Sequence, residues 1–444
     1  MLGKSPASSL LSPKQAAMLR GQLEECASGL GGEVSTRLRA ARLAQIYRGL
    51  GDEGRTTFLR MIATEFCPDP KAVEAAHAEY QKAIGSESQW TAESALRAAL
   101  RSRRLRILTQ FNALSRGVKF LVDLRADLLR LMKDDPSLRS LDRELEAQLT
   151  TWFDVGFLEL QRISWRSPAL LLEKLIKYEA VHEIRSWNDL KNRLDSDRRC
   201  YAFFHPCMPM EPLIFVEVAL VTELAGNVQM LLDEKAPLAD SKRAKTAIFY
   251  SISNTQAGLR GVSFGNFLLK RVVDDLKRND PNLVTFATLS PLPALRSWAE
   301  KTPGIWEQAF TPAMVERVAR HAHGFKVANP NDIANVLGDN TWVAHPALAH
   351  ALEPGLTRLA ARYLLQAKSG SKAYDPVARF HLGNGARVER INPLANTSPQ
   401  GMRQSYGMMV NYLYEPDAIE INVEAFTLQG VVAASTAVRR AGRD

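Results

Sequence analysis

The chain has 444 residues, more than one hydrophobic core usually organises, so we expect two domains. It is 46% hydrophobic and 24% charged, and no apolar run reaches the roughly 20 residues that span a bilayer, which excludes an integral membrane protein. Its four cysteines lack zinc-binding spacing, so no structural metal is expected, and the net charge of +9 favours an anionic partner.

The two ends of the chain bear on its location. The start, MLGKSPASSLLSPK, lacks the apolar stretch of a secretory signal. We interpret it as a disordered tail rather than a transit peptide, because the acidic residues Glu24 and Glu25 follow soon after. The end, RRAGRD, is not a Ser-Lys-Leu peroxisomal address. The predicted location is therefore cytoplasmic.

The pattern from residue 13 to about residue 162 is helical. A long apolar stripe recurs at steps of three and four in FNALSRGVKFLVDLRADLLRLM, and Asp134, Asp135 and Pro136 end that helix. Another helix begins in the next segment, SLRSLDRELEAQLTTWFDVGFLELQRI, and helices are also expected at 14–30, 35–50, 54–66 and 70–83. We predict a helical bundle domain over residues 1–166 that serves packing and subunit contact.

Basic residues are densest in LRAALRSRRLRIL, residues 96 to 108. On one helix Arg97, Arg101 and Arg104 would share a side opposite the leucines, which predicts a solvated amphipathic face. No aromatic residues are interleaved with these arginines, as a binder of single-stranded nucleic acid would need. We therefore predict no nucleic-acid partner.

After about residue 165 the sequence becomes strand-like. The runs CYAFFHP, EPLIFVEVALV, TAIFYSI and LVTFATLS are apolar, β-branched and aromatic, and turn residues separate them. A helix is expected in SFGNFLLKRVVDDLKRN, with its buried stripe at Phe264, Phe267, Leu268, Val272 and Leu276. Strand, glycine-rich turn, helix and strand form a βαβ unit, so residues 167–444 are predicted to be a mixed α/β domain.

The turn before this helix, SNTQAGLRGVSFGNF, is a candidate phosphate site. Gly258, Gly261 and Gly265 permit close backbone approach, and a helix N-terminus attracts anions. The turn is neither a Walker A loop nor a G-x-G-x-x-G fingerprint. Its R-x-x-S-x-G spacing resembles the loop that cradles the coenzyme A pyrophosphate in GNAT acetyltransferases. The alternative is a tight βα connection without a ligand.

Ser290 ends the strand in LVTFATLSPLPALRSW, and Pro291 prevents the strand from continuing. The carboxyl edge of a sheet is where ligands of open α/β folds bind. The G-x-S-x-G motif of hydrolases is absent. On local sequence alone, an N-cap for the helix that follows is the favoured interpretation of Ser290.

A histidine with catalytic potential occurs in RFHLGNGARVERIN. His381 comes just before a glycine-rich stretch, where we expect a loop that turns the imidazole toward a cavity. His205, at a strand end before Pro206, is the rival candidate. Either one is by default a structural histidine.

Several segments together resemble the malonyl-CoA decarboxylase family, in patches from about residue 163 to 425. They are FYSISNTQAGLRGVSFGNFLLKRVVDDL, FATLSPLPAL, FHLGNGARVERIN and YGMMVNYLY, with ISWRSP, YEAVHEI and DRRCYAFFHPCMPMEPLIFVEVAL before them. The resemblance implies an N-terminal all-helical bundle domain used in oligomer assembly, followed by a GNAT-like mixed α/β catalytic domain. It also implies that the protein acts on malonyl-CoA. The helical surfaces favour a homo-oligomer, either a dimer or a tetramer.

The resemblance assigns roles to particular residues. The catalytic residues would be Ser290, His381 and Tyr414, and the coenzyme A loop would comprise Arg260, Gly261, Val262, Ser263, Phe264, Gly265 and Asn266. The sequence departs from animal members at Ser263, where they carry a glutamate. The expected reaction releases CO2 from malonyl-CoA without a metal or organic cofactor, because the thioester itself accepts the electrons. The alternatives are a GNAT-type acyltransferase and a non-catalytic, basic, helical assembly module that binds nucleic acid or another protein.

Overall fold

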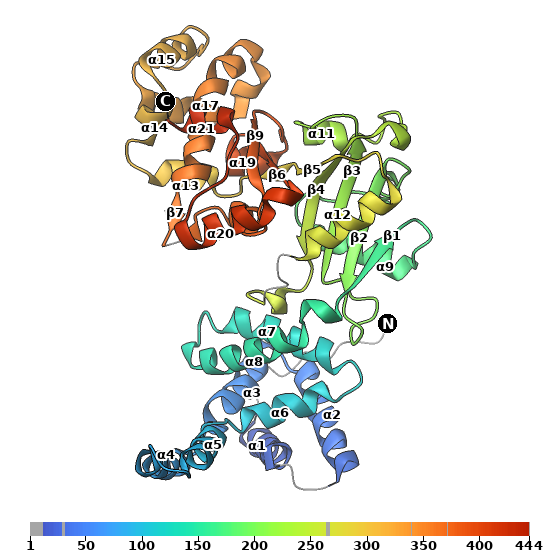
Figure 1. The fold of residues 1–444 in the computed structure, drawn as a ribbon, viewed down its shortest axis with the longest axis vertical. Helices are drawn as coiled ribbons and strands as arrows, with labels where there is room; N and C mark the ends of the chain where they lie inside the picture. Colours follow the sequence, from blue (N-terminus) through green and yellow to red (C-terminus); the bar gives the residue numbers. More distant parts are fainter. Residues whose placement is uncertain (1–11, 29–31, 263–266, 339, 371, 444) are drawn as a thin grey trace. The chain divides into compact units, whose positions relative to one another are not determined.

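The computed structural model describes residues 12–28, 32–262, 267–338, 340–370 and 372–443 (Figure 1). Its chain packs as two units. The helical unit comprises Met1–Glu159, Phe204–Leu213 and Thr255–Gly265, and the sheet unit comprises Leu160–Phe203, Ile214–Asn254 and Asn266–Asp444. Because this division reflects packing and not independent folding, the domain boundary near residue 166 stays a prediction.

The helical unit contains eight α-helices in its described residues, and their apolar faces meet around Leu23, Phe58, Leu108, Leu121 and Leu145, all fully buried. The four helices expected at its start are confirmed to within a few residues. In chain order the helices are α1 Pro13–Ser28, α2 Glu33–Gly49, α3 Asp52–Glu65, α4 Pro70–Ala83, α5 Gln89–Ala99, α6 Arg104–Asn112, α7 Gly117–Leu131 and α8 Arg139–Trp152.

The prediction of one continuous helix over residues 96 to 108 is wrong. The helix breaks between α5 and α6, and Arg104 begins α6 with only 5% of its surface exposed. Its guanidinium donates to Glu144 Oε1 over 2.5 Å and to Ala63 O over 2.8 Å. A buried guanidinium needs such partners, and they come from α3 and α8, which lie far away in the sequence.

The sheet unit is built on a mixed sheet in the order β1-β2-β3-β4-β5-β10-β6, with β9 paired to β10. β4 and β5 run parallel and are joined through α12, Phe267–Asn279, as the predicted βαβ unit requires. The prediction of helices followed by a mixed α/β sheet is thereby confirmed. The strands are β1 Glu159–Ile163, β2 Arg198–Phe204, β3 Ile214–Val221, β4 Thr246–Asn254, β5 Thr285–Thr288, β6 Ser290–Pro291, β9 Arg387–Asn392 and β10 Met409–Leu413.

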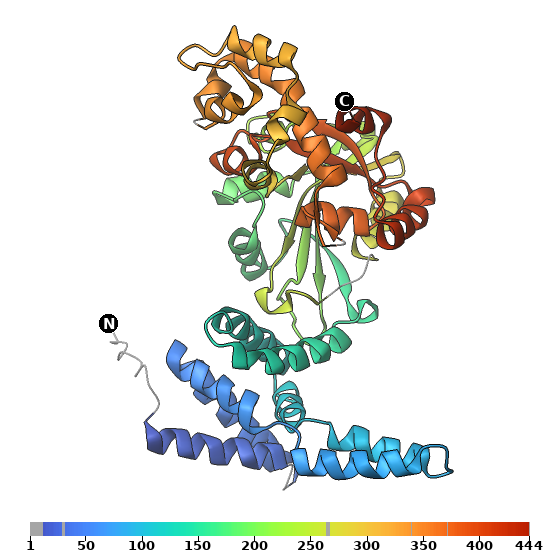
Figure 2. The same cartoon turned by 90° about the vertical axis from the view of Figure 1, so that its left-hand side faces the viewer.

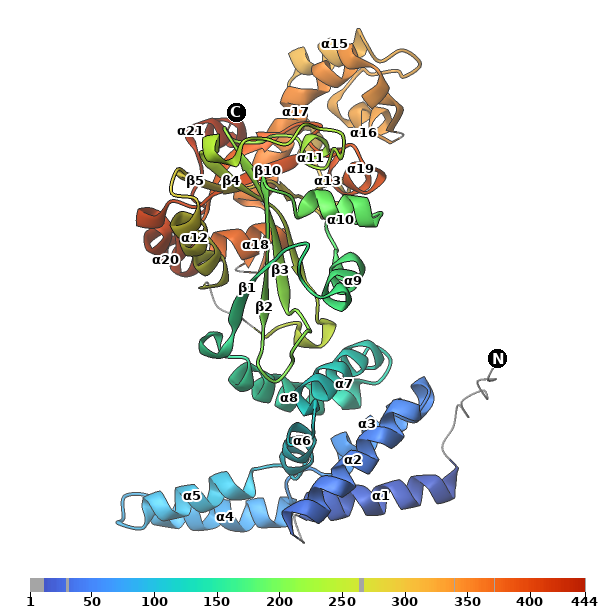
Figure 3. The same cartoon turned by 90° about the vertical axis from the view of Figure 1, so that its right-hand side faces the viewer.

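Helices cover both faces of this sheet (Figures 2 and 3). On one face α12 packs its buried residues Leu268, Val272 and Leu276, three of the five predicted for its stripe. Phe264 and the Phe267 side chain lie outside the described residues. The opposite face is covered by α9, Ala169–Tyr178, and α10, Trp187–Arg193.

The prediction of helical structure up to residue 162 is wrong for the last residues, because β1 occupies Glu159–Ile163. Within the described residues no helix is long and apolar enough to cross a membrane. The remaining elements of the sheet unit are α11 Val228–Leu231, α13 Leu295–Lys301, α14 Ile305–Ala309, α15 Pro312–Ala319, α16 Ile333–Val336, α17 Pro346–Gln366, β7 Lys368–Ser369, β8 Lys372–Ala373, α18 Pro376–Gly383, α19 Pro399–Ser405, α20 Ile419–Gln429 and α21 Thr436–Arg443.

Candidate active site

Ser290, His381 and Tyr414 come together inside the sheet unit. Ser290 begins β6 and pairs with Val410 of β10. His381 lies in the last turn of α18, and Tyr414 directly follows β10. All three side chains are buried, with exposed fractions of 5%, 3% and 6%. Residues that are far apart in the sequence therefore share one interior site.

The three residues form a row of hydrogen bonds. Ser290 Oγ lies 3.1 Å from His381 Nε2. His381 Nδ1 lies 2.7 Å from the Tyr414 hydroxyl. The Tyr412 ring stacks against the imidazole with 4.6 Å between ring centroids and an interplanar angle of 25°. The imidazole is thus fixed through both nitrogens and one face.

Helix α18 carries His381 because Asp375 caps its first turn. The Asp375 carboxylate accepts the backbone N–H groups of Val377 and Ala378 over 2.8 and 2.9 Å, and it also accepts the Tyr363 hydroxyl over 2.6 Å. These bonds satisfy N–H groups that a helix start leaves open. The expectation of a loop at His381 is therefore wrong, since the helix continues to Gly383.

The electrostatics of the row follow from burial. Desolvation lowers the pKa of His381 to about 3, which keeps the imidazole neutral at physiological pH. Burial also raises the pKa of Tyr414 well above its usual value, so the phenol stays protonated. The row is a chain of neutral groups, which can pass a proton without creating a stable buried charge.

The interpretation of Ser290 as a helix cap is wrong. The helix that follows, α13, begins at Leu295 with Ala294 in the capping position and no side-chain cap. The rival His205 belongs to the helical unit and has structural contacts at both ring nitrogens. Its Nε2 lies 3.0 Å from Trp152 O, and its Nδ1 accepts the Cys207 backbone N–H over 3.1 Å.

Part of the predicted coenzyme A loop is described, namely Arg260, Gly261 and Val262 in the helical unit, whereas Ser263, Phe264, Gly265 and Asn266 lie outside the described residues. Gly258 allows close approach to another part of the protein, because a Cβ there would lie 1.8 Å from Val122 O of α7. Arg125 fixes the same segment by donating to Gly258 O over 2.9 Å and to Arg260 O over 2.7 Å. A ligand role for the loop stays a prediction.

The sequence interpretation missed Tyr412 and Thr288. The Tyr412 ring packs on His381, and the Thr288 side-chain oxygen accepts a hydrogen bond from Ser290 over 2.8 Å. Each lies two residues from a predicted site residue on a strand or its continuation. Since side chains two apart on a strand share a face, that spacing was the available signal.

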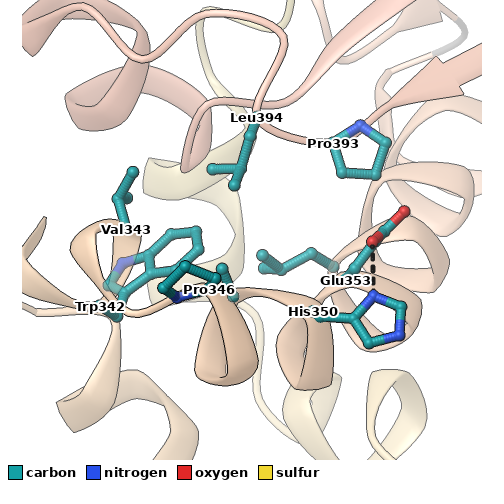
Figure 4. Close-up of a pocket in the computed structure, with 9 residues that line it drawn as sticks. Trp342, Val343, Pro346, His350, Glu353, Pro393 and Leu394 are labelled. Carbon is teal, nitrogen blue, oxygen red and sulfur yellow. Dashed lines mark ion pairs between the residues drawn. The ribbon is translucent and has the colours of Figure 1, made fainter.

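Figure 4 shows a pocket elsewhere in the sheet unit, with a volume of about 350 Å³, formed by α17 and residues around Trp342 and Leu394. Two of its side chains, His350 and Glu353, face each other, with Nδ1 and Oε2 3.5 Å apart. The predicted catalytic residues do not line it, so we do not place the active site there.

Among the described residues no cluster of three or more His, Cys, Asp or Glu side chains could hold a metal ion.

Comparison with known proteins identifies the class. The chain matches the family model for the malonyl-CoA decarboxylase N-terminal domain over residues 66–153 and the model for the C-terminal domain over residues 156–443. It is 36% identical to the mitochondrial malonyl-CoA decarboxylases of Anser anser anser and Mus musculus. These alignments cover 85% and 91% of this chain and 77% and 82% of those proteins. The class is thus that of the carboxy-lyases.

Solved structures agree with this assignment. The crystal structure of malonyl-CoA decarboxylase from Rhodopseudomonas palustris matches with a TM-score of 0.85 and 41% identity, over 96% of this chain and 99% of that one. The enzyme from Agrobacterium vitis matches with a TM-score of 0.85 and 40% identity, over 96% and 100%. The chain belongs to the malonyl-CoA decarboxylase family.

Proposed function

We propose that the protein converts malonyl-CoA to acetyl-CoA and CO2 through an enolate that His381 protonates. The observation that carries this proposal is the buried, neutral row of Ser290, His381 and Tyr414 in a member of this family. Loss of CO2 leaves the electron pair of the broken C–C bond on the thioester as an enolate. The chemistry therefore needs donors for the carbonyl oxygen and an acid for C2.

Ser290 is proposed to bind the malonyl carboxylate through its hydroxyl. Such a bond holds the carboxylate out of the thioester plane, where the breaking C–C bond overlaps the carbonyl π system. Burial supports this role, since Ser290 is 5% exposed and a charge-assisted hydrogen bond is stronger away from water. In this scheme Ser290 stays a hydrogen-bond donor and forms no acyl ester.

His381 is proposed to give its Nε2 proton to C2 of the enolate. An imidazolium is not the donor, because the pKa of His381 is about 3. Instead the neutral ring loses the Nε2 proton while Nδ1 gains one from Tyr414, and solvent restores one proton per turnover. A positioned acid of this kind typically accelerates a reaction about 10²- to 10⁴-fold.

The carbonyl oxygen is proposed to meet backbone N–H groups of β4 around Ile252 to Asn254. β5 pairs with β4 only as far as Phe249, so beyond this point the edge of β4 is no longer covered by β5. Fixed donors aimed at a developing oxyanion are worth about 10²- to 10³-fold each. Residues 260–266 are proposed to hold the pyrophosphate of coenzyme A.

No metal or organic cofactor takes part in this proposal, because the thioester carbonyl accepts the electron pair itself. Activity should accordingly survive dialysis against EDTA.

The oligomer and the location are proposals as well. We propose a homo-oligomer, dimer or tetramer, assembled through the helical unit. The hairpin of α4 and α5 supports it, since α4 buries only Ala83 and α5 buries nothing, while Trp90 is 74% exposed. Light scattering measures the mass in solution.

The predicted cytoplasmic location differs from the mitochondrial one named for the goose and mouse relatives, and cell fractionation tests it.

The decisive experiment is incubation of the purified protein with malonyl-CoA alone, followed by mass spectrometry. We expect stoichiometric acetyl-CoA from the wild type and a loss of about 10²-fold or more in kcat for Ser290→Ala and His381→Asn. Coenzyme A binding should be retained in both variants. Intact malonyl-CoA that still raises the melting temperature would contradict decarboxylation and favour acyl transfer to an acceptor.

A further inference from the structure

The hydrogen-bonded row continues past Ser290 to Thr288. The Ser290 hydroxyl donates to Thr288 Oγ1 over 2.8 Å, and Thr288 is fully buried. Thr288 is the last residue of β5, two positions before Ser290. Its side-chain oxygen is therefore the next atom in the row after the predicted catalytic residues.

Strand β10 donates hydrogen bonds to both the side-chain oxygen and the backbone oxygen of Thr288. The Tyr412 backbone N–H donates to Thr288 Oγ1 over 3.1 Å, and the Asn411 side-chain amide donates to Thr288 O over 2.7 Å. Asn411 is itself fixed, because Asn392 Nδ2 donates to Asn411 Oδ1 over 2.8 Å. The position of the threonine oxygen is thus set by the strand beside it.

These contacts lie where the chain passes from β5 to β6. β10 pairs with both strands in one register, since Leu413 faces Ala287 and Val410 faces Ser290. In that register Tyr412 lies opposite Thr288, and its N–H donates to the Thr288 side-chain oxygen. The Thr288 carbonyl accepts the Asn411 side-chain amide instead.

The direction of the hydrogen bonds follows from the donors. A backbone N–H can only donate, so Thr288 Oγ1 accepts from Tyr412, and the geometry of the Ser290–Thr288 pair makes the Ser290 hydroxyl the donor to the same oxygen. Because the Ser290 hydroxyl proton points to Thr288, Ser290 Oγ can only accept a hydrogen bond from His381. The ring proton of the neutral His381 must therefore be on Nε2. Nδ1 then accepts the Tyr414 hydroxyl, so the whole row points one way.

We infer that Thr288 is a positioning residue whose side-chain oxygen orients the Ser290 proton and thereby selects the His381 tautomer protonated on Nε2. This inference rests on the proposed function, in which that proton goes to C2. When malonyl-CoA binds, Ser290 turns its hydroxyl from Thr288 to the carboxylate, and the tautomer that Thr288 has selected is kept by the Tyr414 hydroxyl on Nδ1. Thr288 acts through Ser290 and touches neither the substrate nor the reacting atoms.

Two substitutions separate this role from packing. Thr288→Val keeps the shape and loses the hydroxyl, whereas Thr288→Ser keeps the hydroxyl and loses a buried methyl group. We expect Thr288→Val to lower kcat about 10-fold or more with KM changed less than about twofold. We expect Thr288→Ser to keep kcat within about threefold although its melting temperature falls. Thr246→Val, at a buried position of β4, is the control for the same substitution elsewhere in the sheet.

A second readout does not depend on turnover. Nitrogen-15 NMR of histidine-labelled protein reports which ring nitrogen carries the proton, and the His381→Asn spectrum identifies the signals of His381. The wild type and Thr288→Ser should show the proton on Nε2, and Thr288→Val should show a shifted or mixed state.

The inference is overturned if Thr288→Val keeps wild-type kcat and His381 signals, or if both variants lose kcat in step with their melting temperatures. A wild type that makes no acetyl-CoA would instead refute the proposed function. In that case the NMR comparison still decides whether Thr288 sets the tautomer.

Discussion

The sheet unit buries two polar clusters that are built in opposite ways. The row of Thr288, Ser290, His381 and Tyr414 contains no charged group at neutral pH. The second cluster is centred on Arg193, which is 2% exposed. Its guanidinium donates to Asp189 over 2.7 and 3.2 Å and to Glu217 over 3.1 Å, and the backbone oxygens of His182 and Glu183 accept from it as well.

The difference shows what each cluster is suited to do. The buried ion pair of Arg193 and Asp189 resists the loss of either charge, because removing one partner leaves the other uncompensated. A buried neutral row can reverse its hydrogen bonds and pass a proton at little cost. The charged cluster therefore suits a structural role that ties α10 to β3, whereas the neutral row suits proton transfer.

The largest effect is expected from breaking the charged cluster. Arg193→Met leaves Asp189 buried without its cation and should destabilise the sheet unit by about 3–5 kcal/mol. Its thermal midpoint should then fall by roughly 10 °C, as measured by circular dichroism. Arg278→Met is the matched control, since the Arg278 side chain is 76% exposed and its bonds to Asp275 and to the Asp274 backbone oxygen lie at the surface. A midpoint equal to that of the control would show that the cluster carries no net stabilisation.

A smaller effect is expected from the pH response of the same cluster. Burial and then the neighbouring Glu179 raise the pKa of Glu217 to about 8. The folded state thus holds a proton that the unfolded state loses near its ordinary pKa, so stability is full at low pH and declines as pH rises to about 8. Between pH 6 and pH 8 the decline should be roughly 2 kcal/mol.

Glu217→Gln should remove this decline, because the amide resembles the protonated carboxyl and cannot ionise. Urea unfolding at pH 6 and pH 8 compares the variant with the wild type. Glu223→Gln, at an exposed position of the same unit, is the control and should keep the wild-type slope. Equal slopes for the wild type and Glu217→Gln would mean that Glu217 is ionised in the folded protein.

The same contrast explains what the sequence could predict. The first four helices depend on local signals, such as Asp69 before Pro70 at the start of α4, and they were predicted to within a few residues. The burial of Arg104 depends on Ala63 and Glu144, which no local pattern connects to it. The glycines after His381 favour a loop there, although Asp375 begins a helix before it.

The site was predictable only in part. Ser290, His381 and Tyr414 were named from the family resemblance, and their catalytic roles stay predictions. Their mutual geometry was not readable, since Ser290 and His381 are 91 residues apart in the sequence. Thr288 is within reach of strand periodicity, but its backbone donor, Tyr412, lies 124 residues away in the sequence and comes beside it only in the folded sheet.

The smallest effect is expected from removing one hydroxyl of the neutral row. Tyr414→Phe keeps the ring but takes away the donor to His381 Nδ1, which lies 2.7 Å away. The tautomer is then no longer held from that side, and Nδ1 takes its proton from solvent instead of from Tyr414. We expect kcat to fall roughly 10-fold, about the worth of one hydrogen bond, while KM for malonyl-CoA stays the same.

Tyr47→Phe is the matched control, because it removes a buried tyrosine hydroxyl that bonds Asp127 over 3.0 Å in the helical unit. Both variants lose the same atom and one buried hydrogen bond, so a general loss of stability should affect them alike. Steady-state kinetics with malonyl-CoA should show the fall in kcat for Tyr414→Phe alone. A rise in KM without a change in kcat would instead make Tyr414 a binding residue, because uniform loss of binding leaves the chemical step untouched.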